Sequence, residues 1–369
     1  MSLTPIQVAF TAKETIPVIS AALDKTLRPK QVILIHTPDP PFRQRAQILR
    51  ELLQENGIAT RLVATPSAFD LPPLLDTLNH LVATYGTQLT LNATTGTHVM
   101  STAALLSAQR HNLRVFYIRP DDRLIWLHPN ESTTLEIEDR INLHHFLRAR
   151  GITIRETEHT HWQAYQPFIR HLYHHRRTLI PQLIQTLRNN NSNNTSAPHL
   201  NPQLRWYLPT PEPHKLPHKN YLRGGWLEHY VYYAALQIKQ SDPQLQDILG
   251  GAKLHSRLHN NHTEVDTLLL YNNRLYVIEC KSLISTSNPA NKIVNFVYKL
   301  DSLMDDLGGQ ITQGMLLTTL KHLPDRVNQR AHFNQIKLVG QNALVHIDRR
   351  LRQWLKPANS QDARNKAAK

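Results

Sequence analysis

TEVDTLLLYNNRLYVIECKS, residues 263–282, contains two runs rich in β-forming residues on either side of Asn272 and Asn273. Two asparagines at this position favour a two-residue turn, so the segment predicts a β-hairpin. If the residues that flank the turn pair with each other, Asp266 lies directly opposite Glu279. The hairpin therefore predicts two acidic side chains that face each other across neighbouring strands.

Side chains alternate between the two faces of a strand, so the charged residues of this hairpin share one face. They are Glu264, Asp266, Glu279 and Lys281. The same face carries Leu268, Leu270, Leu275 and Val277, and the opposite face carries Val265, Leu269, Tyr276, Ile278 and Cys280. Because both faces are apolar, we expect the hairpin to be central in its sheet.

Directly opposed carboxylates lie ~5 Å apart and repel each other. In a half-buried setting the pair of Asp266 and Glu279 is unfavourable unless a cation lies between them, and a hard divalent ion such as Mg²⁺ or Mn²⁺ prefers carboxylate oxygens. Lys281 can orient a water molecule or stabilise charge on a phosphate. Metal, carboxylates and lysine together are suited to hydrolysing a phosphodiester. The alternative is a solvated surface hairpin, which the apolar faces disfavour.

A helix is predicted upstream, from GGWLEHYV at 224–231 through Ile238, with apolar residues at core spacing. Glu228 falls in its first turn. It is a candidate for a further carboxylate of the metal site, or an ordinary first-turn acid that complements the helix dipole.

The first 120 residues alternate short apolar runs with helical patterns. The predicted strands are Ile6–Phe10, Gln31–His36, Ala59–Ala64, Gln88–Leu91 and Leu113–Ile118; the predicted helices are Thr15–Leu27, Phe42–Asn56, Pro72–Tyr85 and Thr97–His111. Short strands that alternate with helices of about a dozen residues indicate a parallel, doubly wound sheet. Ile125–His128 and Thr134–Ile137 fit a closing hairpin.

The segment LNATTGTHVMS, residues 91–101, joins a strand to a helix in this first part. Such a loop points free backbone N–H groups and the positive end of the helix into the crevice, which suits phosphates and sugar hydroxyls. It has neither the P-loop nor the dinucleotide-binding pattern, and a simple helix N-cap remains the alternative. Thr11 follows the first strand and is expected on the same rim.

Charge is distributed unevenly along the 369 residues. Residues 1–150 carry 15 Lys/Arg and 13 Asp/Glu, and the remaining residues carry 27 and 15. A strongly basic second part indicates a polyanionic partner such as a nucleic acid. We expect a first domain at 1–150, connecting helices and a polar linker at 151–204, with Asn189–Pro198 as the polar tract, and a second domain at 205–369.

Cys280 is the single cysteine, which excludes intrachain disulfides and cysteine-based zinc fingers. No apolar run approaches the roughly 18 residues of a membrane span, and the N-terminal MSLTPIQVAFTAKE lacks the pattern of a signal peptide. We therefore expect a cytoplasmic protein with no membrane partner.

The order of Glu228 on a helix, Asp266, and then Glu279-Cys280-Lys281 resembles the PD-(D/E)xK nuclease core. More narrowly, GGWLEHYV, NHTEVDTLLLYNNRLYVIECKS and YKLDSLMDDLGG resemble CARF-domain nucleases, the ancillary effectors of type III CRISPR systems. LNATTGTHVMS is similar to the ligand loop of their CARF domain. The sequence departs from the motif in having Glu264-Val265, with no proline, before Asp266, which leaves the role of Glu264 open.

The resemblance implies an α/β protein with an N-terminal Rossmann-like CARF domain and a C-terminal restriction-endonuclease-like domain. It implies a metal-dependent endonuclease, using Mn²⁺ or Mg²⁺, that is activated in antiviral defence by a cyclic oligoadenylate, cyclic tetra-adenylate above all, bound across a homodimer. The ligand loop then comprises Asn92, Thr94, Thr95, Gly96, Thr97 and His98. Asp266, Glu279 and the Cys280 carbonyl map onto the metal ligands, and Lys281 maps onto the motif lysine. The expected substrates are single-stranded RNA or DNA, or nicked duplex DNA.

Two alternatives remain at this point. Some CARF proteins carry metal-independent HEPN ribonuclease domains with an Arg-x(4–6)-His motif, and Arg326 with His332 or Arg140 with His145 fits that spacing. The second is a non-enzymatic, ligand-responsive regulator that binds nucleic acid, although nothing resembles a helix-turn-helix. That reading leaves the opposed Asp266 and Glu279 unexplained.

Overall fold

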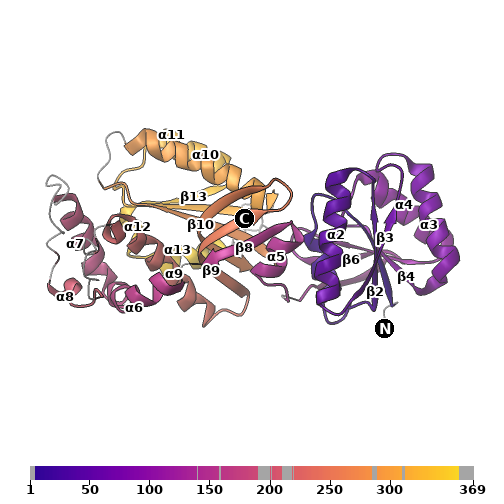
Figure 1. The fold of residues 1–369 in the computed structure, drawn as a ribbon, viewed down its shortest axis with the longest axis horizontal. Coiled ribbons are helices and arrows are strands. Elements are labelled where there is room, and N and C mark those ends of the chain that lie inside the picture. The colour runs from indigo at the N-terminus through magenta and orange to yellow at the C-terminus, as the bar shows by residue number, and fades with distance from the viewer. Residues whose placement is uncertain are drawn as a thin grey trace, which may run out of the picture. The chain divides into compact units, whose positions relative to one another are not determined.

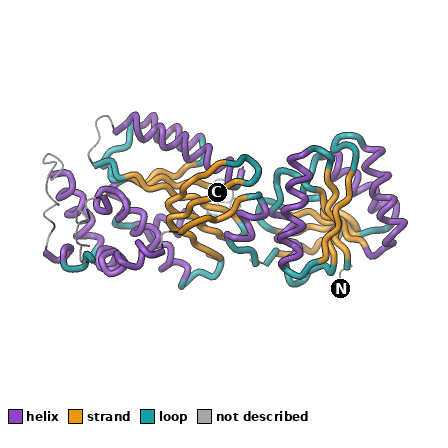
Figure 2. The backbone as a smooth tube through the Cα atoms, viewed as in Figure 1, coloured by secondary structure: helices purple, strands orange, loops and turns teal. Residues whose placement is uncertain are grey.

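A computed structural model describes residues 5–138, 140–157, 159–189, 200, 202–209, 218, 220–284, 289–309 and 312–356. The chain forms two compact units, the first comprising 1–154 with 254–262 and the second comprising 155–253 with 263–369. Each has its own sheet flanked by helices (Figure 2). Apart from Asn189, the polar tract Asn189–Pro198 lies outside the described residues. Among the described helices, none has both the length and the apolar character needed to cross a membrane.

A seven-stranded sheet forms the centre of the first unit, in the order β3-β2-β1-β4-β5-β6-β7. Its strands are β1 (Ile6–Phe10), β2 (Gln31–His36), β3 (Ala59–Ala64), β4 (Leu89–Asn92), β5 (Arg114–Ile118), β6 (Arg123–His128) and β7 (Glu131–Glu136). Strands β1 to β5 pair in parallel, and β6 and β7 add an antiparallel hairpin. The predicted parallel, doubly wound sheet and its closing hairpin are confirmed.

Helices cover both faces of this sheet. They are α1 (Ile16–Leu23), α2 (Pro40–Glu55), α3 (Leu71–Tyr85), α4 (His98–His111) and α5 (Leu143–Ala149). Helices α3 and α4 pack together on one face, and α1, α2 and α5 contact one another (Figure 1). The first helix ends earlier than predicted, because Asp24 is extended and its carboxylate accepts hydrogen bonds from the N–H groups of Thr26 and Leu27.

The second sheet has six strands in the order β13-β12-β11-β10-β9-β8. They are β8 (Ile152–Thr157), β9 (Leu245–Ser256), β10 (Asn261–Tyr271), β11 (Arg274–Lys281), β12 (Gln313–Thr318) and β13 (Ile336–Val339). The helices are α6 (His159–His174), α7 (Arg176–Asn189), α8 (Pro202–Arg205), α9 (Trp226–Lys239), α10 (Pro289–Leu307), α11 (Asp325–Phe333), α12 (Gln341–Leu344) and α13 (Ile347–Leu355). Figure 1 shows α10 and α11 on one side of the strands and α9, α12 and α13 on the other.

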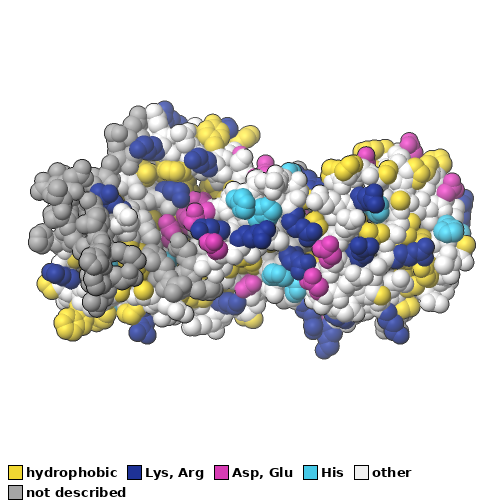
Figure 3. Space-filling view, viewed as in Figure 1, with side chains coloured by type: hydrophobic (Ala, Val, Ile, Leu, Met, Phe, Trp, Pro, Cys, Tyr) yellow, Lys and Arg dark blue, Asp and Glu magenta, His cyan; other side chains and the backbone are white. Residues whose placement is uncertain are grey.

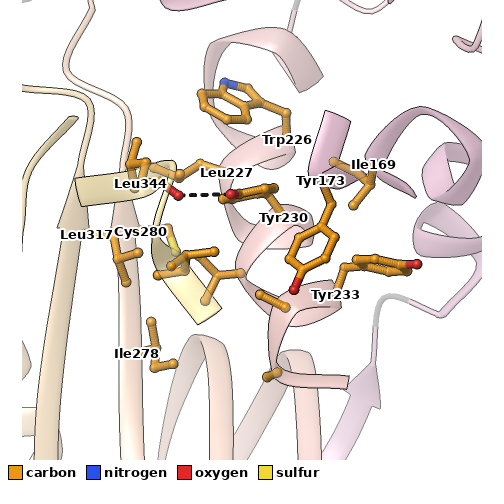
Figure 4. Close-up of a cluster of buried hydrophobic side chains, with 14 of the residues drawn as sticks. Ile169, Tyr173, Trp226, Leu227, Tyr230, Tyr233, Ile278, Cys280, Leu317 and Leu344 are labelled. Atoms are coloured by element: carbon orange, nitrogen blue, oxygen red, sulfur yellow. Dashed lines mark hydrogen bonds between the residues drawn. The ribbon is translucent and has the colours of Figure 1, made fainter. Parts of the chain in front are cut away.

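The hairpin of β10 and β11 occupies the centre of this sheet, as predicted. Its apolar residues are fully buried because helices cover both faces. On the α9 side, Ile278 and Cys280 pack with Leu227 and Tyr230 (Figure 4). A rigid, buried platform of this kind holds the charged end of the hairpin in place.

Candidate active site and ligand loop

The turn between β10 and β11 has the geometry that two asparagines favour. Asn272 and Asn273 both adopt positive φ, at 47° and 54°. The register runs from Tyr271 opposite Arg274 to Thr267 opposite Ile278, which is the predicted pairing. Continued by one residue, this register brings Asp266 next to Glu279.

The charged side chains at the end of the hairpin converge on one side of the sheet. The Lys281 Nζ lies 2.8 Å from Glu279 Oε2 and 3.3 Å from Asp266 Oδ2. The Cys280 N–H donates a 2.6 Å hydrogen bond to the same Asp266 oxygen. Asp266 and Glu279 therefore both contact the Lys281 ammonium, whereas the divalent ion expected between them stays a prediction.

Burial governs the electrostatics of this group. Burial, together with the neighbouring Asp266 carboxylate, raises the pKa of Glu279 to about 7 against the opposing effect of Lys281. Burial also raises the pKa of Asp266, although Lys281 and the Cys280 N–H oppose the shift. Burial alone lowers the pKa of Lys281, but the two carboxylates outweigh it and hold the ammonium protonated. The pair of acids thus lacks the solvation that two negative charges need.

The donor set fits a hard divalent ion. Two carboxylate oxygens already converge on a single cationic centre, the Lys281 ammonium, which acts as a stand-in for a metal ion. Oxygen donors of this type suit Mg²⁺ and Mn²⁺. Within the described residues no three His, Cys, Asp or Glu side chains cluster closely enough to hold an ion. A divalent ion bound here would need further ligands, for which the Cys280 carbonyl, water and Glu228 are the candidates.

Glu228 lies in the first turn of α9, as predicted. Together with Asp266 it lines a small cavity of about 20 Å³, whose wall includes Trp162 and Tyr232. That volume is enough for about one water molecule. Glu228 therefore approaches the hairpin acids from another side.

A larger cleft of about 470 Å³ opens on the charged hairpin end. Glu264, Asp266, Glu279 and Lys281 line it together with side chains from α10, among them Phe296 and Lys299. Sequence reasoning missed both α10 residues. The sequence feature that could have identified them is a helical spacing, which places four residues on one helix face: Phe296, Lys299, Leu300 and Leu303.

The loop after β4 is built largely by its own polar side chains. Asn92 donates to the Pro17 carbonyl and accepts from the Thr94 N–H. The hydroxyl of Thr94 accepts from the Ile118 N–H, and that of Thr95 donates to the Phe10 carbonyl. The hydroxyl of Thr97 accepts from Met100 as an N-cap and donates to the Ala68 carbonyl. These hydroxyls already have partners within the protein.

Other groups of the loop remain open to a ligand. Gly96 and His98 are exposed, and the N–H groups of Gly96, Thr97 and His98 have no hydrogen-bond partner among the described residues. Gly96 has φ 105°, and a Cβ there would lie 2.8 Å from the Met100 sulfur, so glycine is required. Thr11 is buried on the same rim, and within the described part of the chain its hydroxyl has no partner.

Neither Arg-His pair shows an organised site of its own. Arg326 and His332 both lie on α11, where Arg326 donates to Asn291. Arg140 forms an ion pair with Glu138, and His145 takes part in capping α5.

The comparisons with known proteins agree with this architecture. The family model of the Card1 CARF domain matches residues 6–146, and that of the Card1-like endonuclease domain matches residues 217–358. No curated protein matches the sequence. Fold and matches together define the class: an N-terminal CARF domain followed by an endonuclease domain. The chain belongs to the Card1-like family of CARF-domain endonucleases. These matches favour the CARF-domain endonuclease over the HEPN ribonuclease and over the non-enzymatic regulator.

Solved structures share the fold across almost the whole chain. Protein VC1899 from Vibrio cholerae is 21% identical with a TM-score of 0.75, covering 95% of this chain and 98% of its own. Can2 from Sulfobacillus thermosulfidooxidans, solved with cyclic tetra-adenylate, is 19% identical with a TM-score of 0.74, covering 96% and 97%. A type III CRISPR defence DNA nuclease activated by cyclic oligoadenylate is 19% identical with a TM-score of 0.57, covering 87% of this chain and 46% of that one.

Proposed function

We propose that this protein is a metal-dependent endonuclease of type III CRISPR antiviral defence, activated when its CARF domain binds cyclic tetra-adenylate. The observation that carries the proposal is the convergence of Asp266, Glu279 and Lys281 at the end of the central hairpin. Buried acids arranged in this way are stable beside a cation and are suited to phosphodiester chemistry.

Asp266, Glu279 and the Cys280 carbonyl hold the metal in this proposal, and Glu228 is a further carboxylate for it. A divalent ion supplies Lewis-acid stabilisation of the phosphate charge. Lys281 keeps its proton because both acids favour the ammonium, so it donates hydrogen bonds to a phosphate oxygen or to the attacking water. Burial in the cleft limits bulk water around these groups and strengthens their electrostatic effect.

The ligand loop binds the activator through the open amides of Gly96, Thr97 and His98, with Thr11 on the same rim. Asn92, Thr94 and Thr95 hold the loop in shape through the hydrogen bonds described above. A two-fold symmetric cyclic nucleotide fits a two-fold cleft, so the active form is a homodimer. The ligand activates because it binds the active arrangement more tightly than the inactive one.

The substrate is single-stranded RNA or DNA, or nicked duplex DNA. Support comes from the excess of Lys and Arg in the second part of the sequence, which contacts phosphates without reading bases. The single cysteine, Cys280, is buried and free, which suits action in the reducing cytoplasm.

The test is a cleavage assay with labelled single-stranded RNA and DNA, with and without cyclic tetra-adenylate, in Mn²⁺, Mg²⁺ or EDTA. We expect cleavage that requires both the cyclic nucleotide and a divalent ion. Glu279→Gln should abolish it while leaving binding of the cyclic nucleotide intact. Cleavage that persists in EDTA, or in Glu279→Gln, would refute the proposed site.

A further inference from the structure

The cleft beside the hairpin acids has a second wall that the proposed chemistry does not use. Helix α10 presents Phe296, Lys299, Leu300 and Leu303 to the cleft, at the spacing of one helix face. Three of the acids lie along the hairpin wall, whereas the α10 wall carries, besides Ser302 and Asp306, an aromatic ring, a cation and apolar side chains. These are the groups that bind nucleic-acid strands by stacking and by phosphate contact.

Phe296 lies close to the lysine of the proposed active site. The Lys281 Nζ lies 5.7 Å from the centroid of the Phe296 ring and 2.8 Å from Glu279. A phosphate held by Lys281 therefore has this ring within about one nucleotide of it. Phe296 is half-buried, so its ring is fixed by the helix yet still open to the cleft.

Lys299 lies one turn further along the same helix face. It is exposed, and among the described residues it has no ion-pair partner. Lys281, in contrast, is held between two carboxylates. Of the two lysines that line the cleft, Lys299 is therefore the one that no carboxylate holds within the described part of the chain.

We propose that Phe296 stacks on the nucleobase adjacent to the scissile phosphate and that Lys299 contacts a neighbouring phosphate of the same strand. This inference rests on the proposed nuclease function and adds a nucleobase subsite to it. The cleft volume of about 470 Å³ lies within the range of small-ligand pockets, roughly 300–1,000 Å³, and so accommodates a nucleotide. A base stacked on Phe296 must have left its helical stack, so the subsite accepts unpaired nucleotides of any sequence.

The test combines Phe296→Ala with an abasic scan of the substrate. Labelled oligonucleotides, each with one abasic position, are cleaved in Mn²⁺ and cyclic tetra-adenylate by the wild-type protein and by the variant. We expect Phe296→Ala to raise KM by roughly 5- to 100-fold, with kcat changed much less. In the wild-type protein an abasic residue beside a given phosphate should suppress cleavage there by a similar factor. In Phe296→Ala the same abasic residue should reduce cleavage little further, because the substitution and the missing base each remove the same stacking interaction.

Three further variants separate stacking from general damage. Phe296→Trp should restore the low KM, whereas Phe296→Leu, which keeps apolar packing, should not. Tyr298→Ala is the matched control, since Tyr298 lies on the same helix and does not line the cleft. Lys299→Ala should reduce the slope of log affinity against log salt concentration by about one, uniformly across sequences.

The outcomes distinguish a failure of the proposed nuclease function from a failure of the nucleobase subsite. If the wild-type protein cleaves nothing, the proposed function fails. If the wild-type protein cleaves but Phe296→Ala and Phe296→Leu match it at every abasic position, the nucleobase subsite is refuted while the nuclease assignment stands.

Discussion

Replacing Glu279 by glutamine should stabilise the metal-free protein at the same time as it removes activity. Burial and the neighbouring Asp266 carboxylate raise the pKa of this acid from 4.5 to about 7 against the effect of Lys281, and at about 1.4 kcal/mol per pH unit this net shift corresponds to about 3 kcal/mol. The folded-state pKa lies above the unfolded one, so folding favours the protonated acid. The resulting penalty is absent below pH 4.5, grows as the pH rises towards 7, and is complete above 7. Glutamine, which is neutral at every pH, avoids it.

Urea unfolding in EDTA, followed by tryptophan fluorescence, measures this effect. Four of the five tryptophans lie in the second unit, so the signal reports mainly on the domain that contains the site. At pH 8 we expect Glu279→Gln to unfold with a free energy about 3 kcal/mol higher than the wild-type protein, and at pH 4.5 with nearly the same value. Mn²⁺ should stabilise the wild-type protein more than the variant, because the variant has lost a ligand.

Glu264→Gln is the matched control for this experiment. Glu264 lines the same cleft but is exposed, so its replacement should change stability by less than about 0.5 kcal/mol. Equal stabilities of Glu279→Gln and the wild-type protein at pH 8 would show that Glu279 does not share a buried position with Asp266. The two residues would then not form the buried pair of acids on which the proposed metal site rests.

Three other variants test separate parts of the structure. Lys281→Met should lower cleavage by at least about 100-fold while binding of the cyclic nucleotide, measured by calorimetry, stays unchanged. Thr97→Val removes the N-cap hydrogen bond of α4 and the hydrogen bond to the Ala68 carbonyl. It should lower the free energy of unfolding by about 1 kcal/mol, measured in thermal melts, and weaken binding of the cyclic nucleotide. Thr97→Ser keeps the hydroxyl and should behave like the wild-type protein. Tyr230→Phe removes the 2.8 Å hydrogen bond to the Leu344 carbonyl (Figure 4) and should cost about 1 kcal/mol in urea unfolding without changing ligand binding.

The hairpin was predictable because three independent signals agree on its register. The two asparagines favour a two-residue turn, the alternation of side chains sorts the acids onto one face, and the apolar runs place both strands in a covered sheet. A shift of one residue would have moved Asp266 to the opposite face. The first sheet was predictable for a similar reason, since apolar runs such as Gln31–His36 end at turn residues.

The environment of the site could not be read from sequence. Helix α10 reaches the hairpin through tertiary packing. The sequence near residue 281 therefore does not indicate that Phe296 and Lys299 line the same cleft as Lys281. The hydrogen bonds of the ligand loop are equally non-local: Thr95 bonds to Phe10 and Thr97 to Ala68. Sequence reasoning identified these threonines as candidates to touch a ligand, and the structure adds that their hydroxyls hold the loop.

We expect metal binding and strand binding to be coupled by the charges of the cleft. Glu264, Asp266, Glu279 and Asp306 line it, against the two ammonium groups of Lys281 and Lys299. Acidic side chains also gather amid Lys and Arg on the face of the second unit drawn in Figure 3. Without a divalent ion this excess of negative charge would repel a phosphate, although residues 151–369 as a whole carry an excess of Lys and Arg. A divalent ion between the carboxylates would offset this excess negative charge, so each partner would raise the affinity of the other by the same factor. We therefore expect the basic second part of the chain to attract the strand, and a bound divalent ion to let the phosphate enter the cleft.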